Sequence, residues 1–442
     1  MQENIQITGG KKLHGSIDTN TSKNGALALI ATSLLNHGTT RLHHIPKNEE
    51  VLRLLEVITS LEVQAKWVST KGEPDVLEII RPEKLNLRSL NKDTFIKIRV
   101  GLYLIPILLH ENTRFQLPNP GGCKMGERTI SAHRYALENF GVNIRSKATE
   151  YDITYKAKKP SARSSREVVM YESSDTGAVN TLLMSALTLG QTEILFAPPN
   201  YQVQDVCFAL EKMGVNIEGV GTTTLKIRGI ESIKMDLDLY NSEDPIESML
   251  FLSIAAVTHS HLTIKRCPIE FLKIELLKLQ KMGLKFKLSK KSLSQNNKTK
   301  LVDIEVFPSI FTALHDKIHS SAFPGLNVDN LPFFVPVAVM AKGNTLIHDW
   351  MWENRAIYFT ELNRLGADVK LADPHRVFIT GPSKLKGNSI VCPPALRPAT
   401  IILVSMLAAE GTSTLYNIYS IKRGYENLVE RLSSLGADIE YI

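Results

Sequence analysis

The stretch "TIILVSMLAA", residues 400–409, decides the fold of this chain. As a helix it would be apolar around its whole circumference, and such a helix must be buried on every side. Five further stretches are also small and apolar, end in a turn and lead into a β-branched segment. They are "ALALIATSLL" from Ala26, a looser copy "VGLYLIPILL" from Val100, "TLLMSALTLG" from Thr181, "SMLFLSIAAV" from Ser248 and "FVPVAVMAKG" from Phe334.

A second repeated element alternates with the first. Each copy is typical of the last turn of an amphipathic helix, a left-handed glycine and then a β-strand. The copies are "LENFGVNI" from Leu137, "LEKMGVNI" from Leu210, "LQKMGLKF" from Leu279, "LNRLGADV" from Leu362 and "LSSLGADI" from Leu432. A sixth, from Ile58, is degenerate and has Glu62 at the glycine position. The repeating unit is therefore helix, strand, helix, strand, six times.

This pattern predicts an α/β protein in which three units close around their own helices, with sheets outside, and three more units form a second such domain. The alternative is six unrelated αβ units in one doubly wound sheet.

Composition indicates a globular protein. The chain has 442 residues, 43% of them hydrophobic and 22% charged, which suits two or three domains. The start "MQENIQITGGKKLHG" has no apolar stretch of signal-peptide length, and the longest apolar runs fall short of the roughly 18 residues of a membrane span. We expect a cytoplasmic protein with no membrane partner.

The four cysteines lie far apart, with no CxxC or HExxH pattern, so we expect no disulfide framework and no metal. The net charge of +7 is spread over the chain. Its densest basic segments, such as "KFKLSKKSLSQNNKTK", have the composition of solvated loops. A nucleic-acid clamp is disfavoured because the sequence has no basic stripe interleaved with aromatic residues.

Unusual polar groups occur where the buried helices begin. Lys23 follows the candidate N-cap Ser22, and Arg397 precedes Pro398 in another helix start. Because the macrodipole disfavours a cation in the first turn, these two residues predict a bound anion. Asp244, Pro245 and Glu247 instead have the spacing of a capping box.

The loop "LPNPGGCKMGERTISAH", Leu117 to His133, indicates a reactive cysteine. Cys123 is surrounded by glycines, with Lys124 and Arg128 nearby and a helix about to begin, and cationic neighbours favour the thiolate. The glycines predict a lid that closes over a site. We expect Cys207, Cys267 and Cys392 to be buried.

The "SKNGALAL" segment, the "GGCKMGER" loop, "FPGLNVDNL", "WENR" and "KRGYENL", in this order, resemble the enolpyruvyl transferases over essentially the whole chain. The cysteine loop is more similar to the branch that acts on UDP-N-acetylglucosamine than to the shikimate branch. The resemblance implies an inside-out α/β barrel of two domains, each of three βαβαββ-like repeats around buried helices. It also implies domain bounds of 22–242 and of 1–21 plus 243–442, with the active site in the cleft between them.

The resemblance implies transfer of the enolpyruvyl group of phosphoenolpyruvate to the 3-hydroxyl of UDP-N-acetylglucosamine with release of phosphate, the first committed step of peptidoglycan precursor synthesis. No cofactor is expected, and the protein would be a monomer or a weak homo-oligomer. Cys123, Asp329 and Lys23 match catalytic positions, and fosfomycin would alkylate Cys123. The matching phosphoenolpyruvate contacts are Lys23, Arg99, Arg128, Arg397 and Arg423. The matching UDP-sugar contacts are Asn24, Arg99, Arg128, Thr129, Ile130, Ser131, Ala132, Gly177, Asp329 and Met351, and Arg355 matches a further cleft arginine.

The nucleotide half departs from the family pattern. After Arg128 the family reads Pro, Val, Asp, Leu, His, whereas this chain has Thr129 to His133 as "TISAH". Further family positions carry Ser173, Asp175, Asn200, Gln202 and Ala395 in place of the usual charged or polar residues. Two alternatives therefore stay open: enolpyruvyl transfer to a different nucleotide or sugar, and a catalytically lapsed paralogue that binds the ligand.

Overall fold

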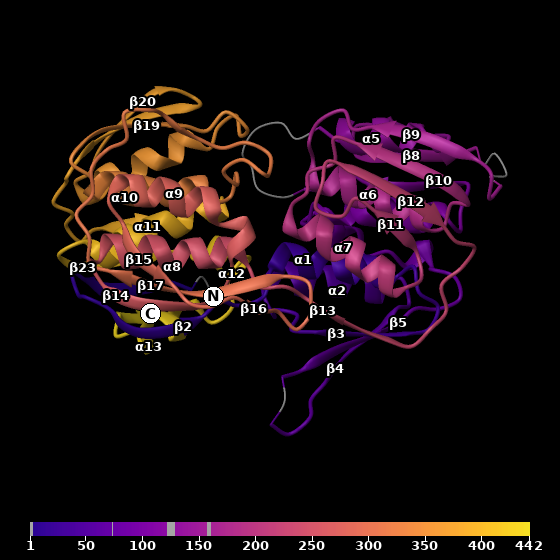
Figure 1. Ribbon diagram of the computed structural model, residues 1–442, viewed down its shortest axis with the longest axis horizontal. Coiled ribbons are helices and arrows are strands. Elements are labelled where there is room, and N and C mark those ends of the chain that lie inside the picture. Colours follow the sequence, from indigo (N-terminus) through magenta and orange to yellow (C-terminus); the bar gives the residue numbers. More distant parts are fainter. Residues whose placement is uncertain (1–2, 73, 122–128, 157–160) are drawn as a thin grey trace. The chain divides into compact units, whose positions relative to one another are not determined.

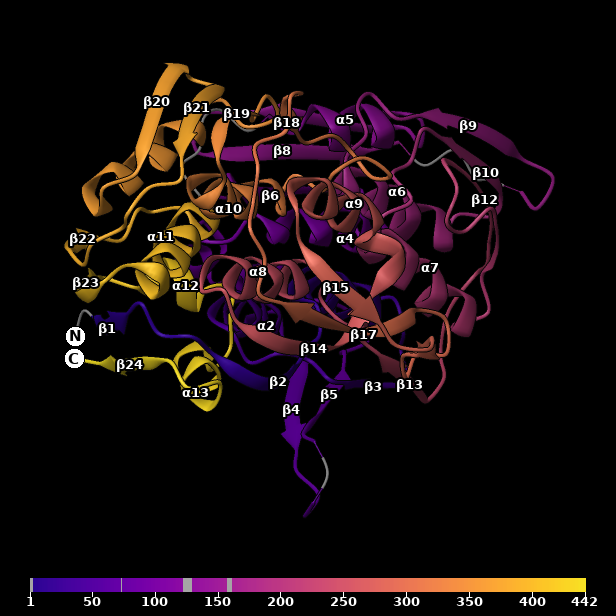
Figure 2. The same cartoon turned by 60° about the vertical axis from the view of Figure 1, so that its left-hand side comes forward.

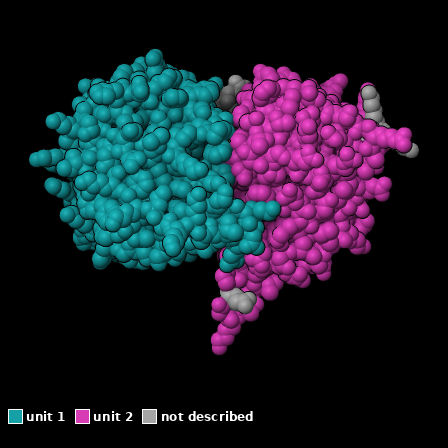
Figure 3. Space-filling model, in the orientation of Figure 1, with its two compact units in different colours: residues 1–20, 123–127, 243–442 teal, residues 21–122, 128–242 magenta. Residues whose placement is uncertain are grey.

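The computed structural model describes residues 3–72, 74–121, 129–156 and 161–442 (Figure 1). The described chain forms two compact units (Figure 3). Unit 1 contains residues 3–20 and 243–442, and unit 2 contains the described residues of 21–121 and 129–242. Cys123 and Arg128 lie outside the described residues.

Unit 2 encloses three apolar helical segments in three sheets of described strands. The enclosed segments are α1 (Lys23–Ser33), the 3₁₀ turn η2 (Val100–Tyr103) with α4 (Leu104–Leu109), and α6 (Asp175–Ala186). The outer helices are α2 (Glu49–Ser60), α3 (Lys92–Phe95), α5 (Ser131–Glu138) and α7 (Tyr201–Lys212), with the 3₁₀ turn η1 (Leu87–Ser89). The sheets run β13-β3-β5-β4, β9-β10-β12-β11 and β6-β8-β7. Their strands are β3 (Thr39–His43), β4 (Gln64–Val68), β5 (Val76–Ile80), β6 (Arg114–Pro118), β7 (Val142–Ser146), β8 (Glu150–Tyr155), β9 (Ser165–Val169), β10 (Gly190–Leu195), β11 (Asn216–Glu218), β12 (Thr224–Gly229) and β13 (Leu237–Tyr240).

Unit 1 repeats this plan. Its enclosed segments are α8 (Pro245–Val257), η4 (Leu331–Phe333) with α10 (Phe334–Met340), and α11 (Leu396–Ala408). Around them are η3 (Ile269–Phe271), α9 (Lys273–Met282), η5 (Ala356–Leu365), α12 (Tyr419–Lys422) and α13 (Leu428–Ser434). The sheets run β2-β14-β17-β15, with β16 on β17, then β18-β19-β21-β20 and β22-β23-β1-β24. Their strands are β1 (Ile5–Gly9), β2 (His14–Asp18), β14 (His261–Pro268), β15 (Lys285–Leu288), β16 (Ser292–Leu293), β17 (Lys300–Phe307), β18 (Ile318–His319), β19 (Gly343–His348), β20 (Asp368–Asp373), β21 (Arg376–Gly381), β22 (Ser389–Val391), β23 (Gly411–Tyr416) and β24 (Asp438–Tyr441).

The predicted inside-out arrangement, with helices enclosed by sheets, is confirmed. Figure 2 shows the same elements in a view turned by 60°. In α8 every residue is buried, and in α11 only the last residue, Ala408, is not. The apolar side chains on every side of these two helices are therefore packed against a sheet or another helix, as their uninterrupted apolar pattern requires. The doubly wound alternative is wrong, because the described strands form separate small sheets rather than one. For the same reason each unit is three open sheets around helices rather than one closed barrel.

The left-handed turns at the ends of the outer helices are also confirmed. Gly141, Gly214, Gly283, Gly366 and Gly436 all have positive φ, between 89° and 119°. The degenerate copy keeps this conformation without glycine, since Glu62 has a φ of 71°. Its side chain accepts a hydrogen bond from the Asn86 amide at 2.8 Å. The turn is thus a property of the repeat, and glycine is only its easiest occupant.

Candidate active site

In unit 1, Asp329 lies beside two arginines. Its carboxylate is 3.4 Å from the Arg397 guanidinium and 3.9 Å from that of Arg355. Asp329 precedes η4, and its backbone N–H donates to the Asn327 side chain at 2.9 Å. It is therefore not the N-cap of this helical segment, a position that Asn330 occupies. A carboxylate held beside two cations is placed to accept a proton from a neighbouring hydroxyl.

Arg355 is fully buried and held by a carboxylate of its own unit. Its Nε and one Nη donate to the two Asp349 oxygens at 2.5 and 2.8 Å, and the same Nη donates to the Val328 carbonyl at 2.7 Å. Two parallel bonds fix the guanidinium plane. Because Val328 directly precedes Asp329, the Asp349–Arg355 pair also fixes the backbone that carries the candidate base. The sequence drew no attention to Asp349.

Arg397 occupies the first turn of α11, as predicted, and is 6% exposed. One Nη donates to the Tyr425 hydroxyl at 2.6 Å. Burial raises the pKa of Asp244 to about 6, and the positive charge of Arg397 acts in the opposite direction. Asp329 and Asp244 thus supply negative charge around Arg397, so a cation in this first turn does not by itself require a bound anion.

The predicted capping box at α8 is half right. Asp244 is the N-cap and accepts from the Ile246 N–H at 2.7 Å, with Pro245 at the first helical position. Glu247 does not return a bond to the cap. Its carboxylate instead accepts from Arg431 at 2.6 Å and from the Asn20 N–H at 2.8 Å.

In unit 2, Lys23 begins α1 directly after the N-cap Ser22, as predicted. Its ammonium is 2.5 Å from the carboxylate of Glu50, and both side chains are nearly buried, at 12% and 11% exposed. Glu50 lies in the first turn of α2, where the macrodipole favours an acid. As at Arg397, a protein carboxylate accompanies the cation, so an incoming anion would share or displace Glu50.

The predicted nucleotide residues lie around the starts of α6 and α7. Asn24 donates to the Tyr201 hydroxyl at 3.1 Å. Asn200 is the N-cap of α7, and its amide donates to Asp175 in the first turn of α6 at 2.8 Å. A family glutamate at position 200 would place a second carboxylate against Asp175, so these two departures from the family pattern are coupled.

The stretch after Arg128 packs on the same end of α6. One Nη of Arg99 donates to the Thr129 carbonyl at 2.6 Å. A methyl group built on Gly177 would meet the Ala132 side chain at 3.3 Å, so the two backbones approach closely there. His133 is buried between the side chains of Asn180, at 2.9 Å, and Thr176, at 3.2 Å. Ile130 is the N-cap residue of α5, and Ser131 is the first residue of this helix.

The other predicted residues fall in unit 1. Arg423 caps the C-terminal end of α12, two residues before Tyr425. Met351 is partly exposed in the turn after β19, two residues beyond Asp349. Asp329, Arg355, Arg397 and Tyr425 thus form one cluster in unit 1, and Lys23 with Glu50 and Asn24 with Tyr201 form contacts in unit 2.

The three described cysteines are buried and free, as predicted. Burial raises the thiol pKa of Cys267 and Cys392 to about 12 and that of Cys207 further. These thiols are therefore unreactive at neutral pH.

Within the described ranges, no group of three or more His, Cys, Asp or Glu side chains could hold a metal ion. No helix in the same ranges is both long and apolar enough to cross a membrane.

The described residues form two units, and in each unit sheets enclose three helical segments. Unit 1 also contains the cluster of Asp329 with Arg397 and Arg355. These features define the protein as an α/β protein of two repeat-built units with a charged site. Residues 7–432 match the EPSP synthase (3-phosphoshikimate 1-carboxyvinyltransferase) family. The chain belongs to this enolpyruvyl transferase family.

Relatives named UDP-N-acetylglucosamine 1-carboxyvinyltransferase match nearly the whole chain. That of Campylobacter fetus subsp. fetus is 32% identical over 437 residues, which are 99% of this chain and 98% of the relative. That of Treponema denticola is 31% identical over 435 residues, covering 98% of both. These relatives support enolpyruvyl transfer as the reaction.

Solved structures confirm the fold. The enolpyruvyl transferase NikO from Streptomyces tendae has a TM-score of 0.84 at 23% identity, covering 100% of this chain and 99% of that one. EPSP synthase from Acinetobacter baumannii has a TM-score of 0.74 at 16% identity, covering 99% of both chains.

Proposed function

We propose that the protein transfers the enolpyruvyl group of phosphoenolpyruvate to the 3-hydroxyl of UDP-N-acetylglucosamine in the cytoplasm, the first committed step of peptidoglycan precursor synthesis. The observation that carries the proposal is the Asp329 carboxylate held beside Arg397 and Arg355. The names of the full-length relatives support the acceptor.

The reaction needs one base and one acid. Asp329 accepts the proton of the sugar hydroxyl while the hydroxyl oxygen bonds to C2 of phosphoenolpyruvate. Cys123 donates a proton to the methylene carbon C3. Loss of a proton from the new methyl group then expels phosphate and restores the double bond. Each step balances without a metal or redox partner.

The anionic substrate needs point charges and forked donors. We assign Lys23, Arg128, Arg397 and Arg423 to phosphoenolpyruvate, with Arg99 beside them. Asn24, Gly177, Met351 and the stretch from Thr129 to Ala132 are assigned to the UDP-sugar. This assignment puts the active site in a cleft between domains 22–242 and 1–21 plus 243–442.

A second candidate is the same transfer to another nucleotide or sugar. It is favoured by the Asn200–Asp175 contact and by Thr129, Ser131 and Ala132, which replace the family's nucleotide-binding residues. The enolpyruvyl transferase NikO shares this fold at a TM-score of 0.84.

The test is phosphate release from phosphoenolpyruvate with UDP-N-acetylglucosamine, other UDP-sugars and free nucleosides as acceptors. Turnover with UDP-N-acetylglucosamine at the highest kcat/KM supports the first proposal. A higher kcat/KM with another acceptor supports the second, and no phosphate release with any acceptor would contradict both.

A further inference from the structure

Of the six sheets that the described strands form, one has three strands and the other five have at least four. In the other five, the strand that follows a buried helix has a parallel neighbour at the sheet edge: β13 on β3, β9 on β10, β2 on β14, β18 on β19 and β22 on β23. The strand β6 follows the buried α4 in the same way. Among the described residues it pairs only with β8, so its sheet has three strands.

The segment that would supply the missing strand has a different structure. In three of the five complete sheets, the parallel strand directly precedes the buried helix, as β9, β18 and β22 do. The corresponding segment before η2 contains the 3₁₀ turn η1 and the short helix α3 instead. This segment does not pair with β6 as a strand. Its side chains instead line a groove beside β6.

The edge of β6 that faces away from β8 has free backbone groups. The flanking bonds, from Tyr155 to the Thr113 carbonyl and from Asn119 to the Thr149 carbonyl, fix which residues face β8. Since alternate residues of an antiparallel strand face the same neighbour, the N–H and C=O of Gln116 point to the open edge. Among the described residues, neither group has a hydrogen-bond partner.

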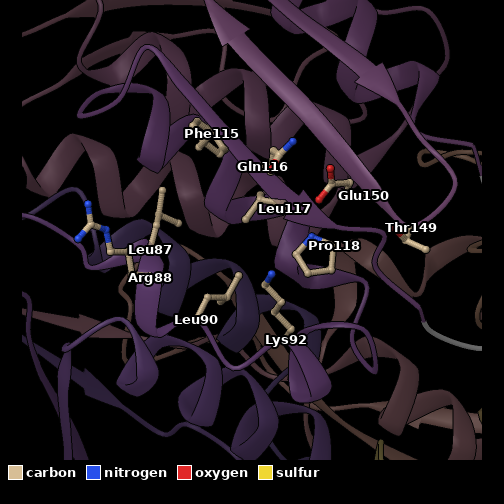
Figure 4. Close-up of a pocket in the computed structure, with 10 residues that line it drawn as sticks. All are labelled: Leu87, Arg88, Leu90, Lys92, Phe115, Gln116, Leu117, Pro118, Thr149 and Glu150. Atoms are coloured by element: carbon tan, nitrogen blue, oxygen red, sulfur yellow. The ribbon is translucent and has the colours of Figure 1, made fainter.

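The groove beside this edge has a volume of about 430 Å³ (Figure 4). On one side are Leu87, Arg88, Leu90 and Lys92, and on the other are residues 115–118 of β6, with Thr149 and Glu150 at one end. Figure 4 shows the Lys92 ammonium directed toward the strand.

The charge of the groove is positive. Lys92 is exposed, and no described carboxylate forms an ion pair with it. Arg88 is also exposed, but its guanidinium points away from β6 in Figure 4. The one acid of the lining, Glu150, forms an ion pair with the Lys147 ammonium at 3.3 Å. Leu90, Phe115 and Leu117 line the groove from the hydrophobic core and are only 8%, 7% and 1% exposed, and Leu87 is partly buried beside them, so the floor of the groove is apolar.

We propose that this groove binds an extended acidic segment of a partner protein, which adds to β6 as the parallel fourth strand that the other five sheets already have. Main-chain bonds to the Gln116 edge provide affinity, and apolar residues alternating with acids provide specificity. Lys92 selects the acids. This binding is independent of the proposed enolpyruvyl transfer.

The test uses the full chain and a fluorescein-labelled capped hexapeptide, Glu-Val-Asp-Val-Glu-Val, in a fluorescence anisotropy titration. A hexapeptide with lysine at each acidic position is the charge control. Two further peptides carry N-methyl groups on one or the other alternate set of residues, because only one set can donate to β6. We expect the acidic peptide to bind, the lysine peptide to bind at least tenfold more weakly, and only one N-methylated peptide to lose binding.

Matched variants locate the peptide. Lys92→Glu should weaken binding at least tenfold, whereas Lys84→Glu, at an exposed lysine outside the groove lining, should change it less than twofold. Gln116→Pro removes the edge N–H without touching a bond to β8 and should abolish binding, and Gln116→Ala should preserve it.

Absence of acidic-peptide binding, equal binding of the lysine peptide, or equal effects of the two N-methylations would overturn the proposal. The alternative occupant of the groove is a second copy of the chain. Sedimentation of the protein without peptide tests this alternative, because it measures self-association. If the parent self-associates and Gln116→Pro abolishes this, a second copy of the chain fills the edge and the acidic partner is wrong.

Discussion

The buried Asp349–Arg355 pair allows a quantitative test of how Asp329 is held. We consider three variants, Arg355→Met, Asp349→Leu and the double variant, each in a Trp67→Phe background. In this background the fluorescence comes from Trp350 and Trp352, which belong to unit 1 and lie close to Arg355 in sequence. Urea unfolding followed by this fluorescence then reports the stability of unit 1.

The magnitude can be worked from the burial of both partners. Neither side chain is exposed, so each single variant leaves a buried charge without its hydrogen-bonded partner, which costs about 3–5 kcal/mol. The double variant leaves no buried charge. Its remaining penalty is the Val328 carbonyl, which loses the Arg355 donor at a cost of about 1–3 kcal/mol. We therefore expect the double variant to be more stable than either single variant, with a coupling energy of at least about 3 kcal/mol.

The control is an exposed pair in the same unit. Arg364 and Glu361 are 3.8 Å apart with side chains 57% and 39% exposed, and Arg364→Met should change stability by less than about 1 kcal/mol. If the double variant loses the sum of the two single losses, the pair is not energetically coupled. The inference that it positions Asp329 would then fail.

Four further outcomes are expected. Asp329→Asn should lower turnover by about 10² to 10⁴ with the fold unchanged, and turnover within tenfold of the parent would remove Asp329 as the base. Because burial raises the pKa of Asp244 from 3.8 to about 6, its contribution to stability is present below pH 4 and lost as pH rises to 6. Asp244→Asn should remove this loss, and parallel profiles of unfolding midpoint against pH for variant and parent would refute the assignment. Peptide mapping after fosfomycin should find label on Cys123, faster with UDP-N-acetylglucosamine present, and label on Cys207 instead would contradict the reactive loop. At the left-handed position of Glu62, the Glu62→Gly variant should be more stable than Glu62→Ala by about 1 kcal/mol, and equal urea midpoints would show that the turn is unstrained.

The repeat architecture could be predicted because its signals are local and recur. A helix such as α8, apolar on every side, cannot face water, and this fact alone puts it inside its sheets. Similarly, the glycines at positions 141 and 214 mark the left-handed ends of outer helices. The degenerate copy at Glu62 was identified by its place in the repeat rather than by its residue type. The absence of a fourth strand beside β6 had only a weak local signal. In "LNLRSLN" the leucines are compatible with a strand, and the asparagines that cap η1 and α3, Asn86 and Asn91, were not recognised as helix starts.

The site was predicted less completely, for a physical reason. A cation in the first turn of a helix requires negative charge nearby, and the sequence attributed that charge to a ligand. At Lys23 it belongs to Glu50, 27 residues later in the sequence, and at Arg397 it belongs in part to Asp329, 68 residues earlier. The first pairing joins the two helices of one repeat, α1 and α2, and the second joins two different repeats. Both pairings are tertiary contacts, so neither helix period nor strand alternation indicates them.

Arg355 combines a structural role with a possible substrate contact. By sequence it matches a cleft arginine, but in the structure two of its donors are committed to Asp349 and one of these also binds the carbonyl next to Asp329. Its remaining Nη has no hydrogen-bond partner among the described residues and lies 3.9 Å from the Asp329 carboxylate. A buried donor left in this state is costly unless something accepts from it. An anion beside Asp329 would meet that need, so Arg355 can both hold the candidate base and contact the substrate that the base serves.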